Sequence, residues 1–130
     1  MKILVIVSVV LSVATIVYGA FNRERLEKFN KNIMECSKEK GLSPSSPTPE
    51  VVLCAVIRDG KLINEKGEYI REAILEAIGE AISNVSKIPE AQEIYKRCHD
   101  EADRAKLTGN EQAMKIATCS MRVITYFDKI

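Results

Sequence analysis

Hydrophobic residues recur at helical spacing along most of this chain. In the most regular stretch, residues 68–86, isoleucines step by four while glutamates fall on the opposite side. This apolar stripe predicts an amphipathic helix. Similar spacing predicts further helices over residues 23–40, 90–107 and 111–123. No segment shows the alternation of a β-strand, so the pattern predicts an all-α fold.

A shorter predicted helix over residues 50–58 differs from the others because it is apolar on nearly all sides. A helix of this kind belongs in the middle of a small protein, with other helices packed over it. The connector before it contains Pro44, Pro47 and Pro49, which exclude a regular helix there. Pro49 can occupy the first turn of the central helix, where a missing N–H costs nothing.

The first residues have a different composition from the rest. Met1 and Lys2 precede an apolar run that ends in small residues, and charges begin again at Arg23. This pattern predicts a secretory signal peptide over residues 1–19, with cleavage after Gly19 or Ala20. The alternative, a retained membrane anchor, is disfavoured because the run is near the lower length limit for spanning a bilayer. We therefore expect one extracellular domain over residues 20–130, without stable membrane insertion.

The charge balance and the cysteines narrow the class of protein further. Without Lys2, one of 19 basic residues, the mature chain carries 18 basic and 18 acidic residues. A neutral chain has no electrostatic reason to bind nucleic acid or an acidic membrane surface. Four cysteines in a secreted chain predict two disulfides, and three pairings are open. The chain has no C-x-x-C or H-x-x-x-H spacing, so a zinc site is disfavoured.

Catalytic motifs are not recognisable in the sequence. His99 is the only histidine, and no nucleophile motif surrounds it. There is no glycine-rich phosphate loop, so we predict neither an enzyme nor a bound cofactor. Asn84-Val85-Ser86 matches a glycosylation sequon. The many apolar residues either surround a pocket for a small hydrophobic ligand or fill a dry core, and the pattern alone favours neither.

The surroundings of the cysteines resemble those of the insect pheromone- and odorant-binding proteins. The likeness is carried by the segment from Cys54 to Gly67, by Cys98-His-Asp-Glu and by the stretch from Gln112 to Cys119. Members usually have six cysteines, and the positions of the second and fifth correspond here to Glu50 and Asn110. The chain therefore looks like the four-cysteine branch. The last helix and the short first cysteine interval also resemble the related fire-ant venom allergens.

The resemblance implies the pairing Cys36–Cys54 and Cys98–Cys119. It also implies a compact bundle of five to six helices around an apolar cavity that carries an odorant, a pheromone or a lipid-like molecule. Only 17 residues separate Cys36 from Cys54, where the family usually has a longer interval with another helix. We therefore expect the cavity wall on that side to differ from that of the family. The alternative is a secreted venom, allergen or signalling protein with a solid core that acts through its surface, for example as a homodimer. On the carrier reading, the candidate wall residues are Phe29, Ile33, Leu53, Val56, Ile57, Ile74, Ile78, Ile82, Met114, Ala117 and Met121.

Overall fold

The computed structural model describes residues 20–130, so the predicted signal peptide over residues 1–19 lies outside them. Five α-helices and two short 3₁₀ helices make up the regular structure of this described part. Its only strand-like pairing is a single bridge between Ile63 and Tyr69. The all-α prediction is therefore confirmed. The elements in chain order are α2 (Arg23–Glu39), α3 (Pro49–Asp59), α4 (Arg71–Glu80), η1 (Val85–Lys87), α5 (Ile88–Arg104), α6 (Gly109–Cys119) and η2 (Met121–Tyr126).

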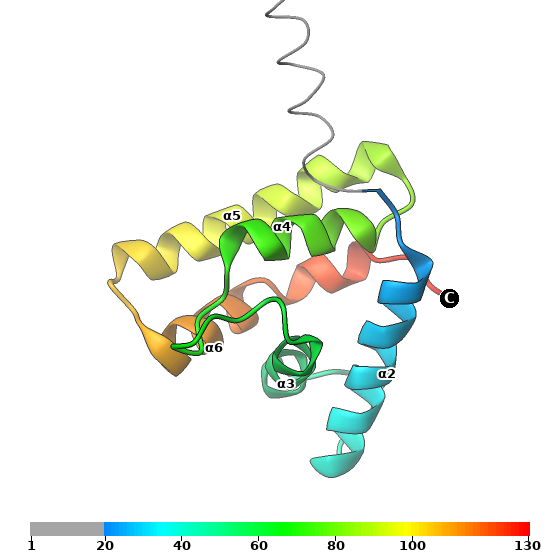
Figure 1. Cartoon of the computed structure of the whole chain (residues 1–130), viewed down its shortest axis with the longest axis horizontal. Helices are drawn as coiled ribbons and strands as arrows, with labels where there is room; N and C mark the ends of the chain where they lie inside the picture. The colour runs from blue at the N-terminus through cyan, green and yellow to red at the C-terminus, as the bar shows by residue number, and fades with distance from the viewer. Residues whose placement is uncertain (1–19) are drawn as a thin grey trace, which may run out of the picture.

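Helices α2 and α3 form one hairpin, and α5 and α6 form a second. Helix α4 and the loop before it connect the two hairpins along the chain. Figure 1 shows α4 and α5 side by side, with α2 crossing at one end and α3 below them. The helix α2 packs mainly on α3, and α5 packs on α4, α6 and η2. The disulfide Cys36–Cys54 joins α2 to α3, and Cys98–Cys119 joins α5 to α6. Both pairings agree with those implied by the family resemblance.

Local signals explain where α2 and α3 begin and end. The Asn22 side chain accepts a hydrogen bond from the Arg25 N–H at 3.1 Å, and Thr48 accepts one from the Val51 N–H at 3.3 Å. Such N-caps satisfy N–H groups that have no partner within the helix. Pro49 occupies the first turn of α3, and Gly60 ends the helix with a positive φ of 81°. The helix predicted over residues 50–58 is thus confirmed, with Val51 and Ala55 fully buried.

The helix predicted over residues 68–86 is shorter than expected. The helix α4 covers only Arg71–Glu80, because Tyr69 and Ile70 are extended and the chain turns at Ala81. Ile82 continues the four-residue spacing but lies in the turn, where it is still buried. Similarly, α6 ends at Cys119, and the following residues form the 3₁₀ helix η2. The four-residue spacing correctly indicated that Ile74, Ile78 and Ile82 are buried, but Ile70 is exposed, and the spacing did not predict the backbone conformation.

Candidate functional site

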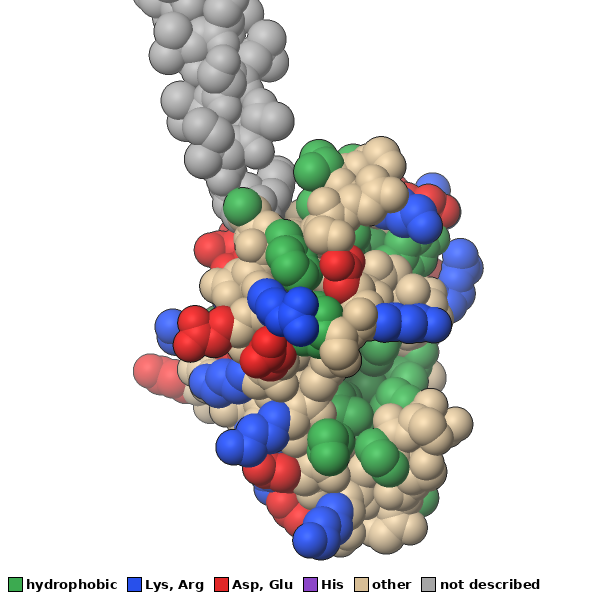
Figure 2. All heavy atoms as spheres, turned by 90° about the vertical axis from the view of Figure 1, so that its right-hand side faces the viewer, with side chains coloured by type: hydrophobic (Ala, Val, Ile, Leu, Met, Phe, Trp, Pro, Cys, Tyr) green, Lys and Arg blue, Asp and Glu red, His purple; other side chains and the backbone are tan. Residues whose placement is uncertain are grey.

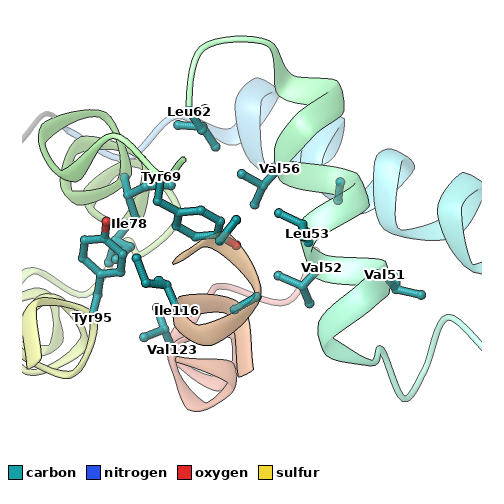
Figure 3. Close-up of a cluster of buried hydrophobic side chains, with 14 of the residues drawn as sticks. Val51, Val52, Leu53, Val56, Leu62, Tyr69, Ile78, Tyr95, Ile116 and Val123 are labelled. Atoms are coloured by element: carbon teal, nitrogen blue, oxygen red, sulfur yellow. The ribbon is translucent and has the colours of Figure 1, made fainter. Parts of the chain in front are cut away.

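An apolar cavity of about 90 Å³ lies between the α2–α3 hairpin, α4 and the C-terminal segment. Helices α2, α3 and α4 contribute most of its wall, together with the loop before α4, one residue of α5 and the C-terminal segment. Figure 3 shows Leu62, Val56, Val52 and Tyr69 converging on this part of the core. The apolar lining consists of Leu26, Phe29, Val52, Val56, Leu62, Ile74, Ala77, Ile78, Ala81, Val123, Ile124 and Phe127.

Ion pairs line one side of the cavity. The Arg25 guanidinium of α2 contacts the Glu80 carboxylate at the end of α4 at 2.5 Å and the Asp59 carboxylate at the end of α3 at 3.3 Å. The Asp59 side chain is only 9% exposed, so these pairs are largely removed from water. The same three residues also line a charged outer groove of about 690 Å³. The Arg25 cluster therefore separates the apolar interior from a polar surface.

The C-terminal segment closes another side of the cavity. The rings of Phe127 and Phe29 meet edge to face, with centroids 5.7 Å apart. The Asp128 N–H donates to the Ala81 carbonyl at 2.9 Å, and the Asp128 carboxylate accepts from the Ser83 N–H at 2.9 Å. The hydrogen bonds from Ser83 lower the pKa of Asp128. The tail thus folds back on the domain, which the sequence left open.

Two tyrosines supply polar groups within the cavity lining. Tyr69 and Tyr95 are both buried, and their rings stack with centroids 6.5 Å apart. The Tyr95 hydroxyl is hydrogen-bonded to Nδ1 of His99 at 2.7 Å, whereas the Tyr69 hydroxyl has no partner within the described part of the chain. Burial raises the pKa of both hydroxyls and lowers the pKa of His99. Both tyrosines therefore stay neutral at any physiological pH.

The backbone of Tyr69 is held by a buried amide on α6. The Tyr69 N–H donates to Oε1 of Gln112 at 2.9 Å, and Nε2 of Gln112 donates back to the Tyr69 carbonyl at 3.4 Å. The neighbouring Glu68 carboxylate accepts from Asn64 and from the N–H of Gly109, both at 3.0 Å, and these bonds lower its pKa. The loop that carries Tyr69 is thus tied to α6 without a covalent bond.

The structure brings four of the predicted wall residues to the cavity: Phe29, Val56, Ile74 and Ile78. Six others belong to the hydrophobic core away from the cavity. Of these, Ile33, Leu53, Ile82 and Ala117 are buried, and Met114 and Met121 are partly buried. Ile57 is on the surface with 54% of its area exposed, so its prediction as a wall residue is wrong. It follows Val56 by one position on α3, and a step of about 100° turns it outward.

Several of the cavity residues that were missed lie outside the α-helices, although Leu26 on α2 and Val52 on α3 were missed as well. Leu62 and Tyr69 sit in the loop before α4, and Val123, Ile124 and Phe127 sit in the C-terminal segment. Helical spacing carries no information in such segments. The signal that could have found Tyr69 is a large aromatic residue in an otherwise polar loop, because exposing its ring would be costly.

Some other arrangements are not found within residues 20–130. No group of three or more histidine, cysteine or acidic side chains there is placed to hold a metal ion. None of the described helices combines the length and apolarity needed to cross a membrane. Asn84 of the sequon lies on the surface, where its side-chain oxygen accepts from Ser86.

The fold and the cavity define a disulfide-linked helical domain with a small apolar interior. The model of the ant venom allergen Sol i 2 family matches residues 35–124. This match spans more than half of the chain and includes all four cysteines, so the protein belongs to that family, which is related to the insect odorant-binding proteins. Neither the curated proteins nor the solved structures contain a significant match to the chain.

Proposed function

We propose that this protein is a secreted carrier that binds a small hydrophobic molecule reversibly in its apolar cavity. The observation that carries the proposal is an apolar cavity of about 90 Å³ bounded by the Arg25 ion pairs and by the C-terminal segment. Two disulfides and the family support an extracellular site of action. We propose that carriage needs neither covalent chemistry nor nucleic acid nor a cofactor.

The cavity volume limits the ligand. Pockets for drug-sized ligands usually measure about 300–1,000 Å³, and an engineered void of about 150 Å³ accepts benzene. At about 90 Å³, the closed form suits molecules smaller than benzene, in the size range of the lightest odorants. A longer pheromone or lipid-like chain would require the helices to separate at the Arg25 cluster. Removing apolar ligand surface from water would then supply the affinity, less the cost of that opening.

The test is a titration of the oxidised, isotopically labelled protein with 2-ketones of increasing chain length, followed by amide chemical shifts. We expect saturable shifts clustered around Val56, Ile78 and Phe127. Ile78→Trp fills the cavity and should weaken binding at least tenfold, whereas Ile57→Trp adds the same bulk on the exposed side of α3 and should not. If no ketone gives saturable shifts while circular dichroism confirms folding, the carrier proposal is rejected.

A second function is supported by the small cavity volume. An interaction protein of the venom or allergen type would act through its surface, and Met34 and Ile57 on adjacent helices expose 60% and 54% of their areas. Figure 2, which views the α2 side of the molecule, shows a recessed patch of hydrophobic side chains beside a cluster of charged ones. On this reading, a homodimer would form at micromolar concentration and Ile57→Lys would dissociate it in sedimentation experiments, with no effect on ketone titrations.

A further inference from the structure

Two buried hydroxyl groups in the described residues have no hydrogen-bond partner, those of Ser37 and Tyr69. Burying a hydroxyl without a partner costs free energy, so each case calls for an explanation. Ser37 is fully buried on α2 and does not line the cavity. Tyr69 is 94% buried, because only 6% of its area is exposed, and it does line the cavity. The two residues therefore differ in whether they line the cavity.

The orientation of Tyr69 is set by its surroundings. Gln112 holds both polar groups of its backbone, the Ile63 bridge holds the strand-like turn, and the Tyr95 ring stacks against its ring. Figure 3 shows the Tyr69 ring extending from its loop toward α3, with the hydroxyl end near Val52 and Leu53. A ring fixed in this way cannot turn its hydroxyl to water without breaking these contacts.

The hydroxyl of Tyr95, which also lines the cavity, has a hydrogen-bond partner. Its oxygen is hydrogen-bonded to Nδ1 of His99 at 2.7 Å. The two stacked tyrosines therefore present one hydroxyl that is already bonded and one that is free to bond. Because burial keeps the Tyr69 hydroxyl protonated, it can donate a hydrogen bond at any physiological pH.

We propose that the Tyr69 hydroxyl is the polar anchor of the ligand site and donates a hydrogen bond to a single oxygen of an otherwise apolar, uncharged ligand. The matching class is a short ketone, aldehyde, ester or alcohol. This inference rests on the proposed carrier function. A carboxylate is disfavoured, because an ionised group in an apolar cavity needs an opposite charge, and Arg25 already pairs with Asp59 and Glu80.

The test compares butan-2-one with 2-methylbut-1-ene, which has the same shape with CH₂ in place of the carbonyl oxygen. Tyr69→Phe should weaken ketone binding about threefold to tenfold, the range expected for one neutral hydrogen bond, and should leave alkene binding unchanged or slightly tighter. Ser37→Ala, which also removes an unpartnered hydroxyl but away from the cavity, should change neither affinity.

The outcomes separate this inference from the carrier proposal. If both molecules bind saturably and Tyr69→Phe leaves the ketone affinity unchanged, the anchor is refuted while carriage stands. If neither molecule binds the wild type, both are refuted. Should Tyr69→Phe not fold, intermolecular NOEs in the wild-type protein decide. Contacts from the ketone methyl protons to the Tyr69 ring support the anchor, and contacts confined to other residues refute it.

Discussion

The two hairpins and the loop between them are held by different kinds of bond. Disulfides join α2 to α3 and α5 to α6, so each hairpin is covalently closed. The loop from Gly60 to Ile70 depends on hydrogen bonds, chiefly those made by Gln112 and Glu68. This loop nevertheless carries Tyr69, the one cavity hydroxyl without a partner. The disulfides therefore hold the two helices of each hairpin together, whereas the position of Tyr69 depends on a few buried hydrogen bonds from the Gln112 amide.

The largest expected effect is the loss of a disulfide from either hairpin. Replacing Cys36 and Cys54 by alanine, or Cys98 and Cys119, should each lower the free energy of unfolding by about 3 kcal/mol, since each link closes a loop of similar length. Urea unfolding of both double variants measures this. A loss below about 1 kcal/mol in either would mean that the noncovalent core alone holds that hairpin.

The second largest effect is expected from removing the side-chain amide of Gln112, which holds the backbone of Tyr69 in the loop before α4. Gln112→Met keeps the shape of the side chain but leaves the buried N–H and carbonyl of Tyr69 unpaired, which should cost about 2 kcal/mol. The same substitution at Gln92, whose amide donates to the Leu75 carbonyl at 2.9 Å, is the matched control. Both variants should be destabilised in urea, but only Gln112→Met should weaken ketone binding. Equal ketone affinities would show that the Gln112 amide does not position Tyr69.

Acidification should lower the free energy of unfolding through the protonation of His99 on α5. Desolvation lowers the folded-state pKa of His99 below its unfolded value near 6.5, despite the nearby carboxylates of Asp103 and Asp100 and with a smaller contribution from Arg71. The unfolded state therefore binds the proton more readily, and stability falls as the pH drops through about 6.5 toward the folded pKa.

Urea midpoints between pH 7.5 and 5.5 isolate this effect, because the lowered pKa values of Glu68, Asp100 and Asp128 act at more acidic pH. The His99→Gln variant should show a flatter pH dependence than the wild type over this window. Parallel curves for the two proteins would exclude His99 as the source.

The smallest expected effect concerns the two unpartnered hydroxyls in the ligand-free protein. Tyr69→Phe and Ser37→Ala each remove a buried polar group that has no partner, so each should raise the free energy of unfolding by up to about 1 kcal/mol. Thermal unfolding in the absence of ligand measures both. A clear loss of stability in Tyr69→Phe alone would mean that its hydroxyl already has a partner, such as a bound water.

The sequence predicted the ends of some helices better than those of others. The first helix and the central helix were predicted to within a residue or two, because Asn22, Thr48, Pro49 and Gly60 mark their ends chemically. The helix around Ile74 was predicted too long, because no comparable cap marks either end and the isoleucine spacing continues into a turn. A different error placed Ile57 on the cavity wall: it lies about 100° around α3 from Val56 and faces solvent.

By itself, the sequence determined the helical class, the bounds of α2 and α3 to within a residue or two and, through its resemblance to known families, the disulfide pairing. These follow from local spacing, capping residues and cysteine order, all of which can be read along the chain. Only the tertiary structure decided that the cavity is small, that the C-terminal segment helps to close it and that Tyr69 lines it. Those features depend on contacts between residues far apart in sequence, such as Tyr69 with Gln112 and Phe29 with Phe127, and no local pattern records them.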